Sequence, residues 1–138
     1  MAHKAQALVQ TCIDFRFRQA IIDFIKNDLK LTDVDHKSDG GGIKMVVQEG
    51  PVRDWIFANY DIAFNLHDVN RLILINHQDC GAYGGSKAFN DEATELTHHT
   101  NELKKAAEII SAKYPGKEIS AYIALISPEN VVSFKQVI

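Results

Sequence analysis

The sequence predicts an α/β fold in which a mostly parallel central sheet is flanked by helices. Short runs of β-branched and apolar residues alternate with segments whose apolar residues recur at helical spacing, which is typical of parallel sheets with crossover helices. The strand predicted at residues 71–76 contains an uninterrupted run of branched apolar residues, Leu72 to Ile75, as in a strand buried on both faces. The length of 138 residues suits one domain, so we expect a single domain over residues 1–138.

Three elements and a turn are expected before residue 43. Residues 7–11 form a β-prone run and predict the first strand. Beyond Arg16, apolar residues at helical spacing predict a helix; they are Ile21, Ile22, Ile25 and Leu29. Residues 31–36 predict a second, weaker strand. Residues 38–42 contain three glycines and predict a turn or a close-approach loop, because glycines hold a regular element poorly.

The next helix is expected from Pro51, which suits the first turn of a helix, to about Leu66. Its predicted apolar face consists of Val52, Trp55, Ile56, Ala63 and Leu66. Four aromatic residues lie nearly all round this helix: Trp55, Phe57, Tyr60 and Phe64. This distribution favours burial on two sides, against the sheet and against a partner subunit, although a deep core would look similar.

The C-terminal half is expected to hold a strand, a long helix and a closing strand. The run at residues 71–76 predicts the central strand, and the amphipathic helix that follows is expected to stop at Pro115 and Gly116. The inward-facing residues of this helix are predicted to be Leu96, Leu103, Ala106, Ala107, Ile109 and Ile110. Residues 119–126 predict a last buried strand, and residues 131–138 predict an edge strand or a tail.

The composition excludes several classes of function. The chain carries 15 Lys and Arg against 18 Asp and Glu, and its basic residues are scattered, so no nucleic-acid partner is expected. No run approaches the roughly 20 apolar residues of a membrane span, and no signal peptide is evident, so we expect no membrane association. The two cysteines exclude a disulfide-rich scaffold and favour a reducing compartment, so we predict a cytoplasmic protein.

Two short polar motifs follow the two best predicted parallel strands. Cys12 comes directly after the first strand, and His77 and Cys80 follow the strand at residues 71–76. In open α/β sheets, ligands bind at the carboxyl ends of the strands. Two thiolates and one imidazole form a zinc ligand set that leaves a fourth position open, as in catalytic zinc sites. A lone cysteine is more often a small buried hydrophobic residue, but the two motifs together favour a metal site.

These motifs resemble the signature of the β-class carbonic anhydrases. That signature pairs a C-x-D-x-R element after the first core strand with an H-x-x-C-G element after a later strand. The corresponding residues here read Cys12-Ile-Asp14-Phe-Arg16 and His77-Gln-Asp-Cys80-Gly81. The order of the expected elements is similar over nearly the whole chain and looks most like the compact prokaryotic branch of the family.

The resemblance implies a zinc lyase that hydrates CO₂ reversibly to bicarbonate. Cys12, His77 and Cys80 would bind Zn²⁺, and a zinc-bound hydroxide would attack CO₂. Asp14 would pair with Arg16 and orient the zinc-bound water, or would occupy the fourth zinc position in a resting form. The fold implied is the family's parallel-sheet α/β homodimer, or a higher homo-oligomer, with active sites near the subunit interface.

The substrate side of the site is where the sequence departs from the family. Gly81 is assigned to substrate binding and would let the chain turn tightly after Cys80. The family run Arg-Asn-Ala-Gly corresponds to residues 37–42, which keep the glycines but lack the Arg and the Asn. The segment before the first strand is also short, whereas many members have N-terminal helices that clasp the partner.

Two alternative functions stay open on the same site. Carbonyl sulfide or carbon disulfide could be the substrate, since relatives of this fold resemble such hydrolases. The chain could also be a non-catalytic zinc-binding homologue that lost turnover.

The glycines do not form a phosphate-binding loop, because no Gly-Lys-Ser/Thr follows them. The spacing from Cys12 to Arg16 is too short for a tyrosine phosphatase loop.

The remaining polar residues near the motifs and along the chain are expected to form turns or to lie at the surface, without a part in catalysis. Asp79 is expected to form the turn between His77 and Cys80. His98 and His99 lie in the long helix and are expected to face solvent. The isolated histidines are expected at the surface as well: His3, His36 and His67.

Overall fold

The computed structural model describes residues 3–138 and contains a five-stranded sheet in the order β2-β1-β3-β4-β5. All neighbouring strands are parallel except β4 and β5, which pair antiparallel. The elements are β1 (Ala7–Thr11), α1 (Arg18–Asp23), β2 (Val34–Ser38), α2 (Lys44–Val47), α3 (Pro51–Leu66), β3 (Arg71–His77), α4 (Glu92–Lys113), β4 (Glu118–Ile126) and β5 (Val132–Gln136). The predicted fold class, a mostly parallel sheet flanked by helices, is confirmed.

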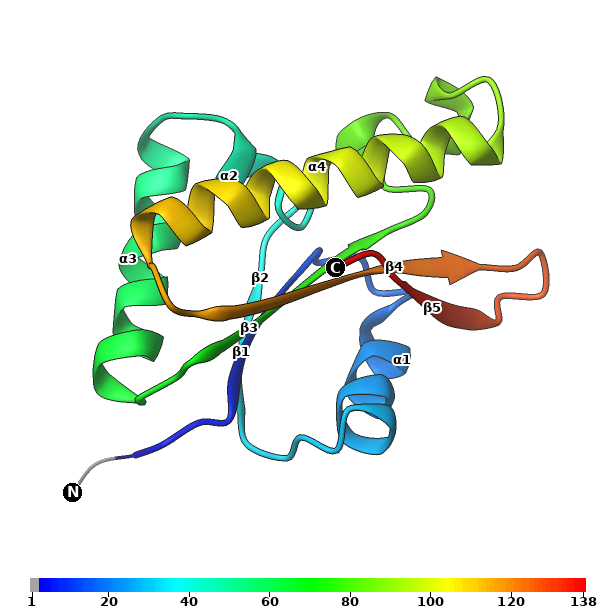
Figure 1. The fold of residues 1–138 in the computed structure, drawn as a ribbon. Helices are drawn as coiled ribbons and strands as arrows, with labels where there is room; N and C mark the ends of the chain where they lie inside the picture. The colour runs from blue at the N-terminus through cyan, green and yellow to red at the C-terminus, as the bar shows by residue number, and fades with distance from the viewer. Residues whose placement is uncertain (1–2) are drawn as a thin grey trace.

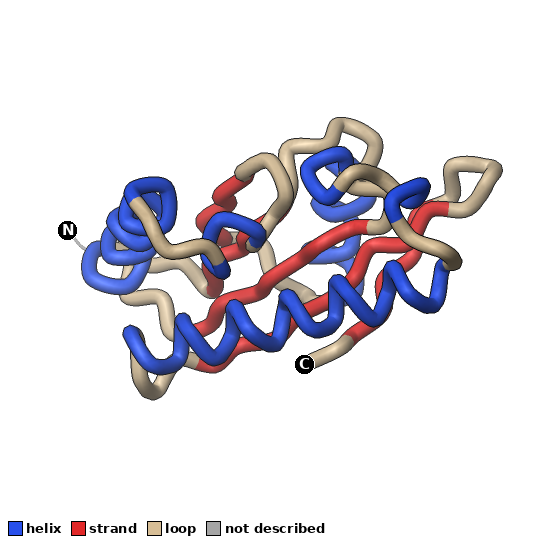
Figure 2. The backbone as a smooth tube through the Cα atoms, turned by 90° about the horizontal axis from the view of Figure 1, so that it is seen from above, coloured by secondary structure: helices blue, strands red, loops and turns tan. Residues whose placement is uncertain are grey.

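Helices cover both faces of this sheet, as Figure 1 shows. Helices α2, α3 and α4 pack on one face, and α1 packs on the other. Seen from above in Figure 2, α4 runs along the length of the sheet. Strand β3 contributes to both layers, because Leu72 and Leu74 belong to the α3/α4 core and Ile73 and Ile75 to the α1 core. Burial on both faces is the reason for its unbroken apolar sequence.

The helix expected through Ile25 and Leu29 is α-helical only to Asp23, and the π-helical turn η1 (Phe24–Asp28) continues it. Two further elements differ from the prediction. Strand β2 begins at Val34 rather than at residue 31. The backbone amides of Thr32 and Asp33 donate to the Gln6 side-chain oxygen at 2.8 and 2.9 Å, so these residues are held outside the strand ladder. The short helix α2 was not predicted, because its four residues are too few for a periodic pattern.

The apolar residues predicted to form one face of α3 do not form a single buried face, so this prediction is wrong. Ile56 and Ala63 are buried, whereas Trp55 and Leu66 are 66% and 65% exposed. At 100° per residue, the apolar side chains divide into a buried face and an exposed one. The exposed apolar residues of the helix are Val52, Trp55, Ile62 and Leu66, and we call them the α3 stripe. The stripe runs the length of the helix beside its buried face.

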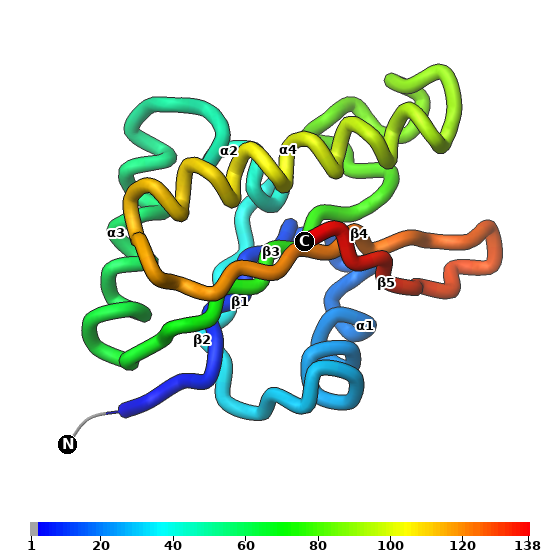
Figure 3. Tube along the Cα trace, in the orientation of Figure 1, coloured from blue at the N-terminus to red at the C-terminus, as the bar shows by residue number. Residues whose placement is uncertain are grey.

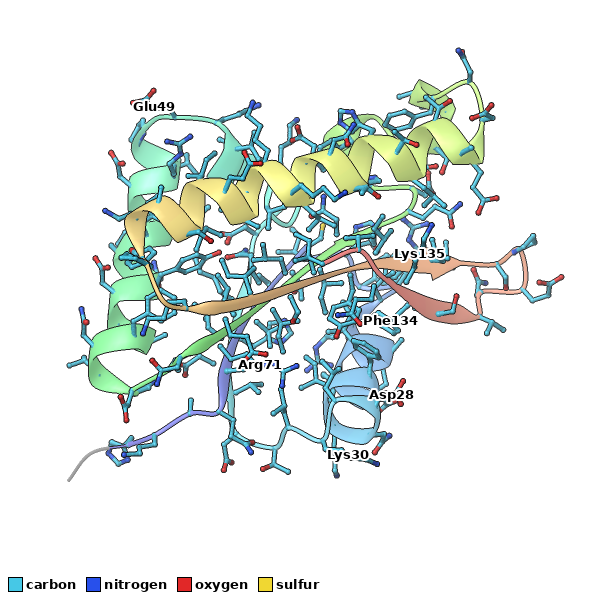
Figure 4. All side chains as sticks on the ribbon, viewed as in Figure 1. Asp28, Lys30, Glu49, Arg71, Phe134 and Lys135 are labelled. Atoms are coloured by element: carbon cyan, nitrogen blue, oxygen red, sulfur yellow. The ribbon has the colours of Figure 1, made fainter. Side chains whose placement is uncertain are left out.

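The C-terminal strand closes the α1 side of the core. Residues 131–138 were predicted to form an edge strand or a tail, and β5 confirms the strand. Figure 4 shows Phe134 pointing from β5 toward α1. There its ring stacks on Phe24 with the centroids 4.0 Å apart and the planes inclined by 10°. Within residues 3–138, no helix combines the length and the apolar character that crossing a membrane requires.

Candidate functional site

The two sequence motifs meet because β1 and β3 are neighbours at the centre of the sheet. Leu8 pairs with Leu72 and Gln10 with Leu74, so the carboxyl ends of the two strands leave the sheet together. Figure 3 shows the two strands side by side. Cys12 follows β1 directly, and His77 is the last residue of β3. The topology therefore brings residues 65 positions apart to one edge of the sheet.

Cys12, His77 and Cys80 form a compact group of potential metal ligands. Their ligating atoms all lie within 4.8 Å of one another, and the two Sγ atoms are 4.0 Å apart. Both cysteines are free thiols. The hydrogen bond between the sulfurs lowers the pKa of the Cys12 thiol well below its usual value and raises the pKa of Cys80. A cation bound between the two sulfurs would displace the proton that their hydrogen bond holds.

The donor set fits a zinc ion. His77 Nδ1 donates to the backbone oxygen of Gln78 at 2.7 Å, so the proton lies on Nδ1 and the Nε2 lone pair is available. His77 Nε2 is buried and has no hydrogen-bond partner among the described residues. A buried acceptor without a partner is costly, and a metal ion would satisfy it. Two thiolates and an imidazole match the ligands that zinc prefers, with room for a fourth.

Asp14 and Arg16 form a fixed pair beside this group. Arg16 Nη2 donates to Asp14 Oδ2 at 2.7 Å, and Arg16 Nε donates to Oδ1 at 3.1 Å, so the contact is bidentate. The Arg16 guanidinium holds the pKa of Asp14 below its usual value. Asp14 Oδ2 also lies 3.8 Å from His77 Nε2. The carboxylate is therefore next to the ligand group but is committed to Arg16.

Asp79 holds the other side of the Arg16 guanidinium. Arg16 Nη1 donates to Asp79 Oδ2 and Nη2 to the Asp79 backbone oxygen, both at 3.0 Å. Asp79 has φ of +58° and lies in the tight turn, as predicted. Its second role, as a partner of Arg16, was not predicted. Arg16 thus joins the two motifs by binding one carboxylate of each.

The turn around Asp79 is supported by Glu95, which the sequence analysis missed. Glu95 is 1% exposed, and its Oε1 accepts the backbone N–H of Asp79 at 2.6 Å. The Ser86 amide donates to Asp79 Oδ1 at 2.8 Å. Helical spacing could have identified Glu95, because it lies eight residues before the buried Leu103 and thus on the same face of α4.

His99 is buried, and the prediction that it faces solvent is wrong. It is 0% exposed and also lies in register with Leu103 on α4. Burial lowers the pKa of His99 to about 4. His98, one residue earlier, is exposed as predicted, and so are His3 and His36. His67 was also expected at the surface but is half-buried, and its Nδ1 lies 2.7 Å from Asp35 Oδ2.

The cleft above the ligand group has a volume of about 850 Å³. Both motifs line it, together with Lys87 and with Gly40 and Gly41. These glycines belong to the turn at residues 40–43, which we call the glycine turn. Gly81 is among the lining residues but does not make the turn possible. A Cβ there would meet nothing within 4 Å, and the left-handed positions belong to Gly84 and Gly85. The predicted turn role of Gly81 is therefore wrong.

The glycine turn approaches β3 too closely for any other residue at position 42. Gly42 has φ of +63°, and a Cβ would lie 2.5 Å from Asn76 Oδ1. We expect Gly42→Ala to reduce the free energy of unfolding by about 1–3 kcal/mol, because both the left-handed backbone and the clash are unfavourable. Thermal denaturation would measure this. Gly40→Ala is the matched control, since a Cβ at Gly40 meets nothing within 4 Å; equal losses in both variants would contradict this explanation.

Comparison with known proteins gives one consistent family. The family model described as "Putative carbonic anhydrase" matches residues 2–129. Uncharacterized proteins of Rickettsia conorii and Rickettsia bellii are 27% and 26% identical over 136 residues. These matches cover 94% of this chain and 72% and 81% of the two relatives.

Solved structures show the same fold. A carbonic anhydrase from Glaciozyma antarctica superposes with a TM-score of 0.64 at 16% identity, covering 100% of this chain and 85% of its own. Tetrameric β-carbonic anhydrases from Sordaria macrospora give 0.66 at 14% identity, covering 98% and 81%. The β-carbonic anhydrase CafA of Aspergillus fumigatus gives 0.65 at 13% identity, covering 97% and 76%.

Proposed function

Because the chain belongs to the β-carbonic anhydrase family, we propose that it hydrates CO₂ reversibly to bicarbonate at a zinc ion held by Cys12, His77 and Cys80. The observation that carries the proposal is the convergence of these three side chains within 4.8 Å, with His77 Nε2 buried and unpartnered among the described residues. Zinc, when bound, would supply a hydroxide nucleophile near neutral pH by acidifying water.

The chain's own residues set how strongly that chemistry is promoted. Two thiolates neutralise the charge of the ion, so the site should acidify water less than three neutral imidazoles would. We therefore expect activity to rise with pH above neutrality. Asp14 is placed to accept a hydrogen bond at the ligand group and so to orient the attacking oxygen. Arg16 holds Asp14 by two donors and keeps this carboxylate from acting as a ligand itself.

Substrate binding is proposed for the cleft beside the motifs, with Gly81 on its wall. A cleft of about 850 Å³ is much larger than CO₂ or bicarbonate, so its walls alone do not enclose such a substrate. Ile13 and Phe15, on the rim, are 68% and 85% exposed. Exposed apolar residues beside an open cleft support a site that a second subunit covers.

The test is stopped-flow CO₂ hydration from about pH 7 to about pH 9 on protein whose zinc content is measured in the same sample. Activity that rises with pH in zinc-loaded protein would support the proposal. Fully loaded protein without turnover would contradict it. Release of H₂S from carbonyl sulfide by the same sample would then indicate the hydrolase, and inactivity on both substrates would indicate a non-catalytic zinc protein.

We also propose that the protein is a homodimer or a higher homo-oligomer that associates through the α3 stripe. Val52, Trp55, Ile62 and Leu66 expose apolar surface along one helix face, and such patches mark interfaces more often than free surface. The tetrameric state of the Sordaria macrospora enzymes supports association in this family.

Free thiols suit a reducing compartment, so we propose a cytoplasmic location.

Trp55→Glu is expected to shift the protein toward monomer, because a buried carboxylate without a partner is unfavourable in an apolar interface. Light scattering coupled to size-exclusion chromatography would measure the mass. Val131→Glu is the matched control, since Val131 is 65% exposed and the charge change is the same. An unchanged mass in Trp55→Glu, or an equal shift in the control, would exclude the α3 stripe as the interface.

A further inference from the structure

The side chain of Asn76 joins three segments that surround the candidate site. Asn76 lies one residue before His77 and is 1% exposed. Its Oδ1 accepts the backbone N–H of Ile43 at 3.2 Å. Its Nδ2 lies 3.3 Å from the Tyr83 hydroxyl and 3.2 Å from His99 Nδ1. One buried amide therefore contacts the glycine turn, the turn after Cys80 and helix α4.

These contacts define the orientation of the amide and the tautomer of His99. A backbone N–H can only donate, so the Asn76 atom that Ile43 reaches must be the oxygen. The two Nδ2 hydrogens then go to Tyr83 and His99. His99 Nδ1 accepts, which leaves its proton on Nε2 and the ring neutral. Burial of His99 and its lowered pKa agree with this assignment.

The glycine turn connects Asn76 to the ligand group through hydrogen bonds at both of its ends. Gly41 donates its backbone N–H to Cys12 Sγ at 3.4 Å. Ile43, two residues later, is the residue that Asn76 binds. Gly42 lies between them and packs directly against the Asn76 amide, so the turn has little freedom to move. The position of the Gly41 donor therefore depends on Asn76.

We propose that Asn76 is a positioning residue for the metal centre, which fixes the glycine turn so that the Gly41 N–H is donated to the Cys12 sulfur. This inference rests on the proposed function, because it concerns the same ligand group. An N–H donated to a thiolate withdraws charge from the sulfur and weakens its donation to a bound ion. In a site with two thiolates, that hydrogen bond leaves the ion a stronger acid.

Cadmium provides a direct test, because an NMR-active cadmium isotope couples to amide protons that donate to its thiolate ligands. We expect the Gly41 amide of nitrogen-labelled, Cd²⁺-loaded protein to show this coupling. Asn76→Leu removes all three hydrogen bonds at similar volume, and the coupling should disappear. Loss of Cd²⁺ to a chelator should become at least about 10-fold faster, because the glycine turn no longer holds Cys12 in position, and this effect outweighs the stronger donation from a sulfur without its hydrogen bond.

Two further variants make the test specific. Tyr114→Phe removes a hydrogen bond to Asp61 near the other end of α4 and should change neither readout. Asn76→Ser has a hydroxyl too short to reach Ile43, and it carries the test if Asn76→Leu does not fold. Coupling that persists in these Asn76 variants, or its absence from wild-type protein that holds Cd²⁺, would overturn the inference. Wild-type protein that takes up no Cd²⁺ or Zn²⁺ would instead refute the metal centre and the proposed function.

Discussion

Cys80→Ser is expected to remove both the bound metal and the CO₂ hydration activity. Cys80 is 2% exposed, and Cys12, whose sulfur lies 4.0 Å away, is the only other cysteine of the sequence, so no further thiol can replace it. A serine hydroxyl is a poor zinc ligand because it does not ionise as a thiol does. Loss of residues that merely support metal ligands costs about 10–100-fold, so loss of a ligand should exceed about 100-fold. Elemental analysis and stopped-flow kinetics on the same sample measure both effects.

A pair of histidine variants controls for nonspecific damage. His77→Ala should lose the metal as Cys80→Ser does, because it removes the one nitrogen ligand of the group. His98→Ala changes an exposed histidine outside the group and should keep full metal content and activity. Full zinc content in Cys80→Ser or His77→Ala would show that these residues are not the ligands. The family assignment would then stand without this metal site.

The order of elements and the edge that carries the site follow from local sequence. The four residues Leu72 to Ile75 of β3 are all apolar, because their side chains enter the cores on both faces of the sheet in alternation. Strand β1 alternates between the same two cores. Since parallel neighbours end at the same edge, the residues after both strands had to be close. The sequence therefore predicts that Cys12, His77 and Cys80 share one edge of the sheet, and the pairing of β1 with β3 is what brings them close.

The polar contacts of buried side chains could not be predicted from the sequence. Glu95, His99 and Asn76 are all buried, although residues of these types are usually exposed. Each has a specific partner from a distant part of the chain, although His99 is bound only at Nδ1 and its buried Nε2 has no partner among the described residues. Helical spacing does indicate that Glu95 and His99 share the buried face of α4. It does not reveal which groups they meet there.

The division of α3 into two apolar faces shows the same limit. Trp55 and Ile56 are adjacent and both apolar, yet one is 66% exposed and the other is buried. A hydrophobic pattern predicts that a helix face is buried, but it does not tell whether the sheet or a second subunit buries that face. Only the packing of Ile56 against the central core separates the two faces.

Arg16→Ala is expected to keep the metal and lose most of the activity, about 10–100-fold. Arg16 makes bidentate contact with Asp14 and also binds Asp79, so its removal frees the Asp14 carboxylate. The pKa of Asp14 then rises toward its usual value, which still lies well below neutral pH. Asp14 would remain charged and could take the fourth ligand position at the ion. Zinc content and kcat of the same preparation test this expectation.

Two comparisons separate this gatekeeping role from a general loss of charge. Arg18→Ala removes an exposed arginine two residues away and should leave kcat unchanged. Asp14→Asn should lower kcat as well, and the double variant should be no worse than Asp14→Asn alone, because Arg16 acts through Asp14. Additive losses would mean that Arg16 has its own role, through Asp79 or the substrate. Full activity in Arg16→Ala would show that Asp14 needs no restraint, because water or hydroxide would then already outcompete the free carboxylate for the open position.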